Sequence, residues 1–261
     1  MKTKKTISAN PQSPFRDLGQ NKYLHYIVFA DLLRYPSQDY TVKAQECLNM
    51  LQKNYPEGAE EIKPFVDYMY SHSQDQREEL YTKTFDVQPI CYLDLGYVLF
   101  GEDYKRGAFL LHMQEEQLKA SNDCGTDLSD NISNMLTLFT KTDNQELLDE
   151  LAVKILIPGI EKMISEFKQA RVDLKMKILK KLHRAVIQEE LNHGNVYRNL
   201  FSSMLYVFNK DFENVSFKAV IDPVVDVQHH NSFFGKQGVN ILANVLDKNV
   251  ANQLENNYKL D

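Results

Sequence analysis

The sequence has few cysteines and no long apolar run, and these shortages exclude several classes of protein. The three cysteines, Cys47, Cys91 and Cys124, are widely spaced and odd in number, so neither a disulfide scaffold nor a zinc finger is expected. No uncharged apolar stretch reaches the roughly 18 residues that span a bilayer. Residues 1–15 are basic and then polar, which is not the pattern of a secretory signal. We therefore expect a cytoplasmic protein without stable membrane insertion.

Glycine and proline are also scarce, with ten and eight residues among 261. Between them, apolar residues recur every three or four positions, which is typical of amphipathic helices. The stripes and their borders are residues 24–35 before Pro36, 40–51 before Pro56, 65–70 after Pro64, 132–139 after a candidate N-cap at Ser129, 148–155 before Pro158, 160–185, and 196–207. The sequence therefore predicts an all-α fold, a single-domain helical bundle of about eight to ten helices over residues 20–209, after a flexible N-terminus over 1–19.

The end of the chain has a different composition. Residues 210–261 begin with β-branched and aromatic residues, are interrupted by Pro223, and then contain the pair His229 and His230. This pattern lacks helical periodicity, so we expect an irregular C-terminal extension that lies over the bundle. A short hairpin or a partner-binding arm is the alternative interpretation.

Charge is unevenly distributed along the chain. The net charge is −6, but residues 57–150 carry 20 acidic and 7 basic side chains, a net charge of −13. Carboxylates around an apolar groove would suit a peptide with basic residues beside a leucine-rich stretch. Residues 168–184 instead hold seven basic side chains against Asp173, which indicates a solvated helix face or an adaptor surface for phosphate, headgroups or an acidic partner. The acidic total argues against nucleic acid as the main partner.

Two pairs of residues have the spacing of metal ligands on a helix. Glu190 and His193 form a Glu-x-x-His step, and His112 precedes Glu115 by three residues. A ferritin-like metal-binding bundle needs two such steps in the same order, and here the second is reversed. We therefore expect solvated helix residues at both places and no metal. No nucleophile elbow, phosphate-binding glycine loop or dinucleotide fingerprint is present, so we expect no enzyme activity, no catalytic residues and no intrinsic cofactor.

An ordered set of motifs lies in the acidic region and just before it. In chain order they are Leu-Leu-Arg-Tyr-Pro at 32–36, Tyr-x-x-Thr-Phe-Asp at 81–86, an apolar aromatic helix over 87–100, Gly-x-x-x-x-Arg-Gly at 101–107 followed by Ala-Phe-Leu-Leu, and a helix over 127–139. Together they resemble the NarJ-type assembly chaperones, the so-called delta subunits of nitrate reductase within the wider TorD/DmsD group. The resemblance extends over residues 20–205. In the last motif only Asp130, Leu136 and Phe139 match the family pattern.

The resemblance implies an all-α chaperone, monomeric or dimeric, that is not an enzyme. Such proteins bind the N-terminal segment of the catalytic (alpha) subunit of a molybdenum oxidoreductase, here one similar to nitrate reductase or nitrite oxidoreductase. They hold that subunit in the cytoplasm while molybdopterin guanine dinucleotide and iron–sulfur clusters are inserted. These cofactors belong to the client.

Site residues follow from the same resemblance. Asp86 and Asp130 are expected to contact the arginine side of the client peptide, because carboxylates accept bidentate bonds from guanidinium groups. The expected aromatic and apolar peptide contacts are Tyr81, Phe85, Tyr92, Tyr97 and Met135. The alternative is that these side chains fill the bundle core. Arg106 is expected to bind a carboxylate of the client or cofactor, or to pair internally with Glu102 or Asp103. Gly101 and Gly107 are expected to shape a turn and to allow close helix packing.

Overall fold

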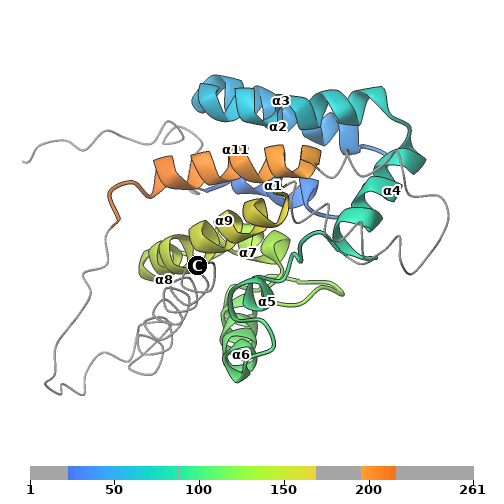
Figure 1. The fold of residues 1–261 in the computed structure, drawn as a ribbon. Coiled ribbons are helices and arrows are strands. Elements are labelled where there is room, and N and C mark those ends of the chain that lie inside the picture. The colour runs from blue at the N-terminus through green and yellow to red at the C-terminus, as the bar shows by residue number, and fades with distance from the viewer. Residues whose placement is uncertain (1–22, 88, 169–194, 216–261) are drawn as a thin grey trace, which may run out of the picture.

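The structure is a computed structural model that describes residues 23–87, 89–168 and 195–215 (Figure 1). Its elements are α1 (Tyr26–Leu32), α2 (Tyr40–Asn54), α3 (Pro56–Ser71), α4 (Gln74–Phe85), α5 (Leu95–Phe100), α6 (Tyr104–Lys119), α7 (Ile132–Leu138), α8 (Gln145–Leu151), the π-helical turn η1 (Ala152–Leu156), α9 (Ile157–Glu166) and α11 (Asn195–Asp211). Within these ranges the only β-pairing is an isolated antiparallel bridge between Asp94 and Asn131. The all-α prediction is therefore confirmed.

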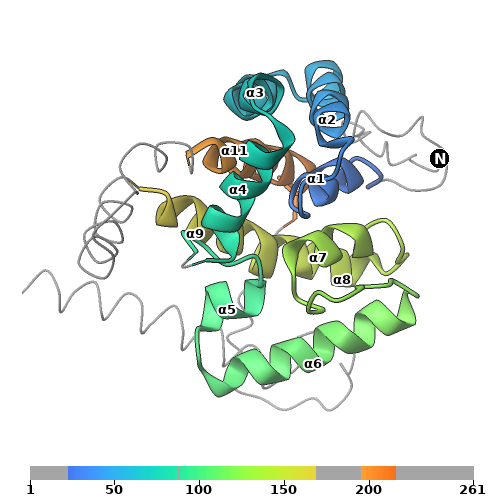
Figure 2. The same cartoon turned by 90° about the vertical axis from the view of Figure 1, so that its right-hand side faces the viewer.

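The helices pack in successive layers, as Figure 1 and Figure 2 show. Helices α2 and α3 lie side by side, α11 packs between α3 and α9, and α1 packs between α2 and α7. Helix α5 packs on α9 and carries α6 at the end of the molecule opposite to α2 and α3. Aromatic rings fill the centre: Tyr197 of α11 is fully buried, with ring centroids 4.7 Å from Phe85 and 5.3 Å from Phe65.

A buried carboxylate joins the first helices to the last one. Asp211, at the end of α11, accepts hydrogen bonds from the hydroxyl groups of Tyr55 at 2.6 Å and Tyr26 at 2.9 Å. Nε2 of His25 lies 2.7 Å from the same carboxylate. His25 directly precedes α1, Tyr26 is the first residue of α1, and Tyr55 directly follows α2. Asp211 therefore fixes the end of α11 against the N-terminal helices.

Two of the predicted stripes are reproduced with their buried faces. Helix α2 begins at Tyr40 and buries Tyr40, Ala44, Cys47 and Leu51 as the periodicity indicates. Helix α11 likewise buries Leu200, Met204 and Val207 of its stripe, while Val196 at its start is half-buried. Both helices are long enough for the period of 3.6 residues to identify one face.

The predicted face of the first helix is wrong. The stripe from Leu24 to Tyr35 suggested that these two residues face the core, but Leu24 is 38% exposed and Tyr35 is 52% exposed. Helix α1 spans only Tyr26–Leu32 and buries Tyr26 and Phe29 instead. This helix has only two turns and carries apolar residues on all sides, so periodicity does not identify its buried face. The large aromatic rings occupy the core instead, and the ring of Tyr26 stacks on that of Phe208 with centroids 4.4 Å apart.

The helix border expected before Pro56 is confirmed, because α2 ends at Asn54, but Pro64 and Pro158 lie within helices that they were expected to border. Helix α3 begins at Pro56 and contains Pro64 on its solvent-exposed face, where water can bond the carbonyl that proline leaves without a donor. Helix α9 contains Pro158 in its first turn, directly after the π-helical turn η1. The N–H of Ile157 bonds to the carbonyl of Ala152, so helical backbone runs from η1 into α9 and Pro158 lies within a continuous helical segment.

Two more local expectations need correction. Among the described residues of the apolar segment 87–100, only Leu95–Phe100 are helical. Before α5, Asp94 is extended and pairs with Asn131. The N-cap of α7 is Asn131 rather than Ser129, because the Asn131 side chain accepts the N–H of Ser133 at 3.0 Å. The part of the predicted stripe 160–185 that follows Lys168, and the extension from residue 216 on, lie outside the described residues.

Candidate functional site

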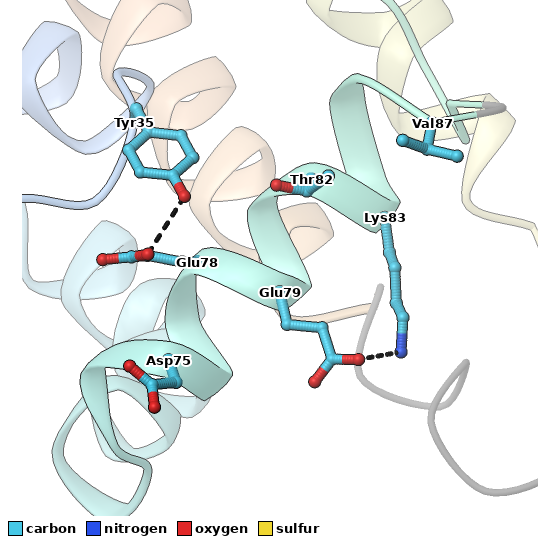
Figure 3. Close-up of a pocket in the computed structure, with 7 residues that line it drawn as sticks. All are labelled: Tyr35, Asp75, Glu78, Glu79, Thr82, Lys83 and Val87. Atoms are coloured by element: carbon cyan, nitrogen blue, oxygen red, sulfur yellow. Dashed lines mark hydrogen bonds and ion pairs between the residues drawn. The ribbon is translucent and has the colours of Figure 1, made fainter.

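An open groove runs along α4 and has a volume of about 470 Å³ (Figure 3). We call it the acidic groove; its lining residues are Tyr35, Asp75, Glu78, Glu79, Thr82, Lys83 and Val87. Three of these side chains are carboxylates, and all but Tyr35 and Val87 lie on α4. The groove lies within the acidic part of the chain, but the sequence motifs did not single out its carboxylates.

The sequence of α4 places its acidic residues on one face. A capping box fixes the start of the helix: Gln76 Oε1 accepts the N–H of Ser73 at 2.9 Å, and Ser73 Oγ accepts the N–H of Gln76. From there Asp75, Glu78 and Glu79 follow at spacings of three and four, which put them on the same side of a helix. The opposite face buries Leu80, Tyr81, Thr84 and Phe85. One amphipathic helix thus turns its apolar side to the core and its carboxylates to the groove.

Apolar surface is exposed at both ends of the groove. Tyr35 donates a hydrogen bond from its hydroxyl to Glu78 Oε2 at 3.0 Å, while 52% of the residue stays exposed. Val87, just beyond α4, is 66% exposed. Lys83 forms an ion pair with Glu79 at 2.6 Å (Figure 3). The groove therefore combines carboxylates with an exposed ring and an exposed aliphatic side chain.

A second group of carboxylates, the carboxylate cluster, lies beyond the C-terminal end of α4. Its members are Asp86, Asp94, Asp127 and Asp130. Partial burial and then the charge of Asp127 raise the pKa of Asp86. Burial is also the main cause that raises the pKa of Asp94, where the charge of Asp127 adds to the effect. Burial and the charge of Asp94 raise the pKa of Asp130 to about 6. The four groups thus belong to one electrostatic network.

The loop before α5 and the loop before α7 bring two of these carboxylates together. The N–H of Leu95 donates to the carbonyl of Asp130 at 3.0 Å, and the N–H of Ile132 donates to the carbonyl of Leu93 at 2.9 Å. Oδ2 of Asp130 accepts the N–H of Gly96 at 2.9 Å. Its other carboxylate oxygen is buried and has no hydrogen-bond partner among the described residues. Asp130 is therefore positioned by backbone groups.

Two arginines flank the cluster. Arg34 lies 3.6 Å from Asp127 and donates to Asn134 Oδ1 at 3.1 Å. The guanidinium of Arg106 lies 5.0 Å from the ring centroid of Tyr97, and its positive charge lowers the pKa of both Asp94 and Asp130.

The Arg106 contacts differ from the internal ion pair considered above. Arg106 lies over Tyr97 instead of pairing with Glu102 or Asp103. Asp103 caps α6, because its Oδ1 accepts the N–H of Lys105 at 2.9 Å. The stacking geometry is a cation–π contact, which a guanidinium forms more readily than an ammonium group.

The aromatic and apolar residues predicted to contact a peptide divide into two sets. Tyr81, Phe85 and Met135 are buried, and Phe85 packs against the rings of the core. Tyr92 is 42% exposed, and its ring centroid lies 4.2 Å from that of half-buried Tyr97. Only the second set lies where a ligand can reach it without rearrangement of the core.

The two glycines of the Gly-x-x-x-x-Arg-Gly motif have different surroundings. Gly101 ends α5 with a φ of 63°, a conformation that favours glycine. Gly107 lies inside α6, and a Cβ atom there would contact nothing within 4 Å. A third glycine, Gly96, lies against Asp130 and was not singled out by the sequence.

Several other predicted features fall elsewhere or outside the described residues. In the part of the chain that the structure describes, no three or more His, Cys, Asp or Glu side chains are grouped so as to hold a metal ion. His112 and Glu115 are exposed on α6, while Glu190, His193 and the basic segment after residue 168 are not described. Among the described helices, none has the length and apolarity needed to cross a membrane.

Comparisons of the chain with models of known protein families, with curated proteins and with solved structures found no match. The resemblance of the sequence motifs to a chaperone family therefore stays a prediction. The candidate site has to be interpreted from its own geometry, which consists of an acidic groove, an adjoining carboxylate cluster and exposed tyrosines.

Proposed function

We propose that this protein is an assembly chaperone that binds the basic N-terminal segment of the catalytic subunit of a molybdenum oxidoreductase similar to nitrate reductase or nitrite oxidoreductase. The observation that carries the proposal is the acidic groove, where carboxylates of α4 lie between exposed Tyr35 and Val87. The proposed activity is binding without chemistry, in the cytoplasm. Molybdopterin guanine dinucleotide and iron–sulfur clusters enter the client and need no site in the chaperone.

The charges of the groove favour arginine. Asp75 and Glu79 are exposed. Glu78 is half-buried, and its two oxygens accept hydrogen bonds from the Tyr35 hydroxyl at 3.0 Å and from Gln74 Nε2 at 2.7 Å, so an arginine would share or replace these donors. A guanidinium group can form two parallel hydrogen bonds with a carboxylate, which gives both energy and orientation. The single lysine of the groove is already paired with Glu79, so it offsets only part of the negative charge.

The apolar ends of the groove suit the rest of such a peptide. The exposed ring of Tyr35 offers a surface for a leucine side chain or for the flat face of an arginine. From Asp75 to Asp86 the helix rises about 16 Å, which matches about five residues of an extended peptide. A short segment with paired arginines and adjacent leucines therefore fits the length and the chemistry of the groove.

The carboxylate cluster extends the negative surface beyond the groove. Asp86 is exposed beside Val87 and can contact a peptide directly. Asp130 is fully buried, so we propose that it contributes by holding Gly96 and by its charge beside Asp94. Four carboxylates face two guanidinium groups, those of Arg34 and Arg106, and the excess negative charge attracts a basic segment.

The test is binding of a fluorescent synthetic peptide that contains an Arg-Arg pair followed by a leucine-rich stretch. The double variant Glu78→Gln/Glu79→Gln is expected to weaken binding about tenfold or more, because each charge-assisted bond contributes about 1.5–3 kcal/mol. The variant Asp86→Asn is expected to weaken binding by a smaller factor. Isothermal titration calorimetry at two salt concentrations measures both affinities.

The matched control is Glu60→Gln/Glu61→Gln, which removes two exposed carboxylates from α3. This variant has the same net charge as Glu78→Gln/Glu79→Gln and is expected to bind the peptide with unchanged affinity. Equal loss in both double variants would mean that total charge, not the groove, attracts the peptide. Unchanged binding in both double variants and in Asp86→Asn would refute the acidic site.

A further inference from the structure

Two exposed carboxylates lie at opposite ends of α4, on the same side of the helix. Asp75 is in the first turn, and Asp86 is the C-cap, whose backbone stays in the right-handed helical region. Three helical turns separate them, so they lie on one side and about 16 Å apart along the axis. Among the described residues, neither side chain forms a hydrogen bond or an ion pair. Both carboxylates are therefore available to a ligand.

The two carboxylates between these ends are already engaged. Glu78 accepts hydrogen bonds from the Tyr35 hydroxyl at 3.0 Å and from Gln74 Nε2 at 2.7 Å. Glu79 forms an ion pair with Lys83 at 2.6 Å (Figure 3). Negative charge without a partner in the described part of the chain is thus concentrated at the two ends of the helix.

Asp86 belongs to the groove although it follows the last residue of α4. It directly precedes Val87, which lines the groove. Desolvation is the first cause that raises the pKa of Tyr35, the hydrogen bond and charge of Glu78 follow, and the charge of Asp86 adds to them. Because Tyr35 is itself a lining residue, the charge of Asp86 acts inside the groove.

We propose that the groove selects peptides in which two basic residues are five positions apart, one held by Asp75 and the other by Asp86. This inference rests on the proposed function, since it specifies which basic segment the acidic groove binds. Five residues of extended chain cover about 16 Å, the same length as the rise between the two carboxylates. Two adjacent arginines could reach both carboxylates only by splaying their side chains along the groove, at a cost in rotamer entropy.

The middle of α4 determines what lies between the two basic residues. Lys83 and Thr82 line the groove between its acidic ends. The positive charge of Lys83 disfavours a further basic residue at this place, and such a repulsive element contributes to specificity. The residues between the two basic positions are therefore uncharged.

Two fluorescent peptides of equal length and composition test the spacing on the full chain. One carries two arginines separated by four uncharged residues, and the other carries the same arginines side by side. The wild-type chain is expected to bind the spaced peptide about three- to tenfold more tightly, which is the gain from one additional exposed ion pair between guanidinium and carboxylate. Fluorescence anisotropy gives both affinities.

Asp86→Asn is expected to remove this preference, because only one end of the groove then holds an arginine, and Asp75→Asn is expected to do the same. Asp67→Asn removes an exposed carboxylate from α3, has the same net charge, and should keep the preference. Circular dichroism checks that the three variants are folded. Equal affinities of the wild-type chain for the two peptides would overturn the proposal, and so would a preference that survives in both Asp75→Asn and Asp86→Asn.

The same titrations separate this inference from the proposed function. If the wild-type chain binds both peptides equally and Glu78→Gln/Glu79→Gln weakens both, the groove binds basic segments without reading their spacing. In that case the proposed function stands and the spacing inference fails. If neither peptide binds to the wild-type chain, both proposals are refuted.

Carbodiimide cross-linking tests the placement directly. The probe is the spaced peptide with lysines in place of the two arginines, since this reagent joins an amine to a carboxylate in contact with it. Mass spectrometry is expected to find one lysine linked to Asp75 and the other linked to Asp86. Links to only one of these carboxylates would contradict a peptide that spans the groove.

Discussion

Gly96 and Asp130 fit together closely at the point where α5 begins. The Asp130 Oδ2 atom accepts the Gly96 N–H at 2.9 Å, and a Cβ atom on Gly96 would lie 2.5 Å from that oxygen. It would also lie 3.0 Å from the ring of Phe109. The absence of a side chain at Gly96 is therefore what allows the buried carboxylate to reach the backbone.

Replacement of this glycine should destabilise the protein. Gly96→Ala is expected to lower the free energy of unfolding by about 1–3 kcal/mol, because Asp130 or Phe109 must move. Gly107→Ala is the matched control, since its Cβ meets nothing within 4 Å, and it should raise stability by about 0.5–1 kcal/mol. Urea unfolding measures both, and equal effects would contradict the close fit at Gly96.

The buried carboxyl group of Asp130 should make stability depend on pH. Its pKa of about 6 in the folded protein lies above its ordinary value of 3.8, so the folded state binds the proton more tightly. The contribution of this group to stability therefore rises as pH falls from about 6 to about 4, and it is lost as pH rises through 6.

The variant Asp130→Asn removes this titration. It is expected to raise the free energy of unfolding at pH 7 by about 1–3 kcal/mol and to flatten the pH profile between 4 and 6. Thermal unfolding across that range is the measurement. Asp67→Asn, an exposed change on α3, is the control that should keep the wild-type profile. A wild-type profile in Asp130→Asn would show that another group titrates.

The hydroxyl of Tyr55 should contribute to stability through Asp211. Tyr55→Phe leaves the buried carboxylate without its 2.6 Å donor, which is expected to cost about 1–3 kcal/mol. Tyr206→Phe removes a hydrogen bond of 2.7 Å to Glu57 at the surface and should cost well under about 1 kcal/mol. Denaturant unfolding of the two variants makes the comparison, and similar losses would refute the special role of Asp211.

The exposed ring of Tyr35 should contribute to peptide binding. Tyr35→Ala is expected to weaken binding of the Arg-Arg peptide about three- to tenfold, because an exposed stacking contact contributes about 1 kcal/mol. Tyr35→Phe, which keeps the ring, should bind nearly as well as wild type. Tyr70→Ala removes a tyrosine of similar exposure from α3 and is the control. Fluorescence anisotropy gives the three affinities.

Part of the candidate site was predictable from the sequence. The motif residues Asp86, Tyr92, Tyr97, Arg106 and Asp130 do lie around one cluster of charges. The acidic face of α4 could also have been predicted, because spacings of three and four place carboxylates on one side of any helix. The net charge of the long region 57–150 does not show this, since it does not reveal which carboxylates share a helix.

Other parts of the site had no local signal. Asp94 and Asp127 lie in loops, and their proximity to Asp86 and Asp130 depends on how α4, α5 and α7 pack. The apolar stripe 24–35 predicted that Tyr35 is buried, but Tyr35 is exposed. Helix α1 ends at Leu32, so Tyr35 lies outside the helix to which the periodicity applies. A period identifies a face only within a regular helix and carries no information about loops.

The sequence by itself determined the all-α class, the faces of long helices such as α2, and the acidic character of the central region, because periodicity and charge are local properties of the chain. Only the tertiary structure decided which residues far apart in the sequence contact each other. His25 and Asp211, 186 positions apart, lie 2.7 Å from each other, and Gly96 lies against Asp130. Such contacts arise from the packing of whole helices, in which large buried rings and carboxylates need particular partners, and no spacing in the sequence encodes them.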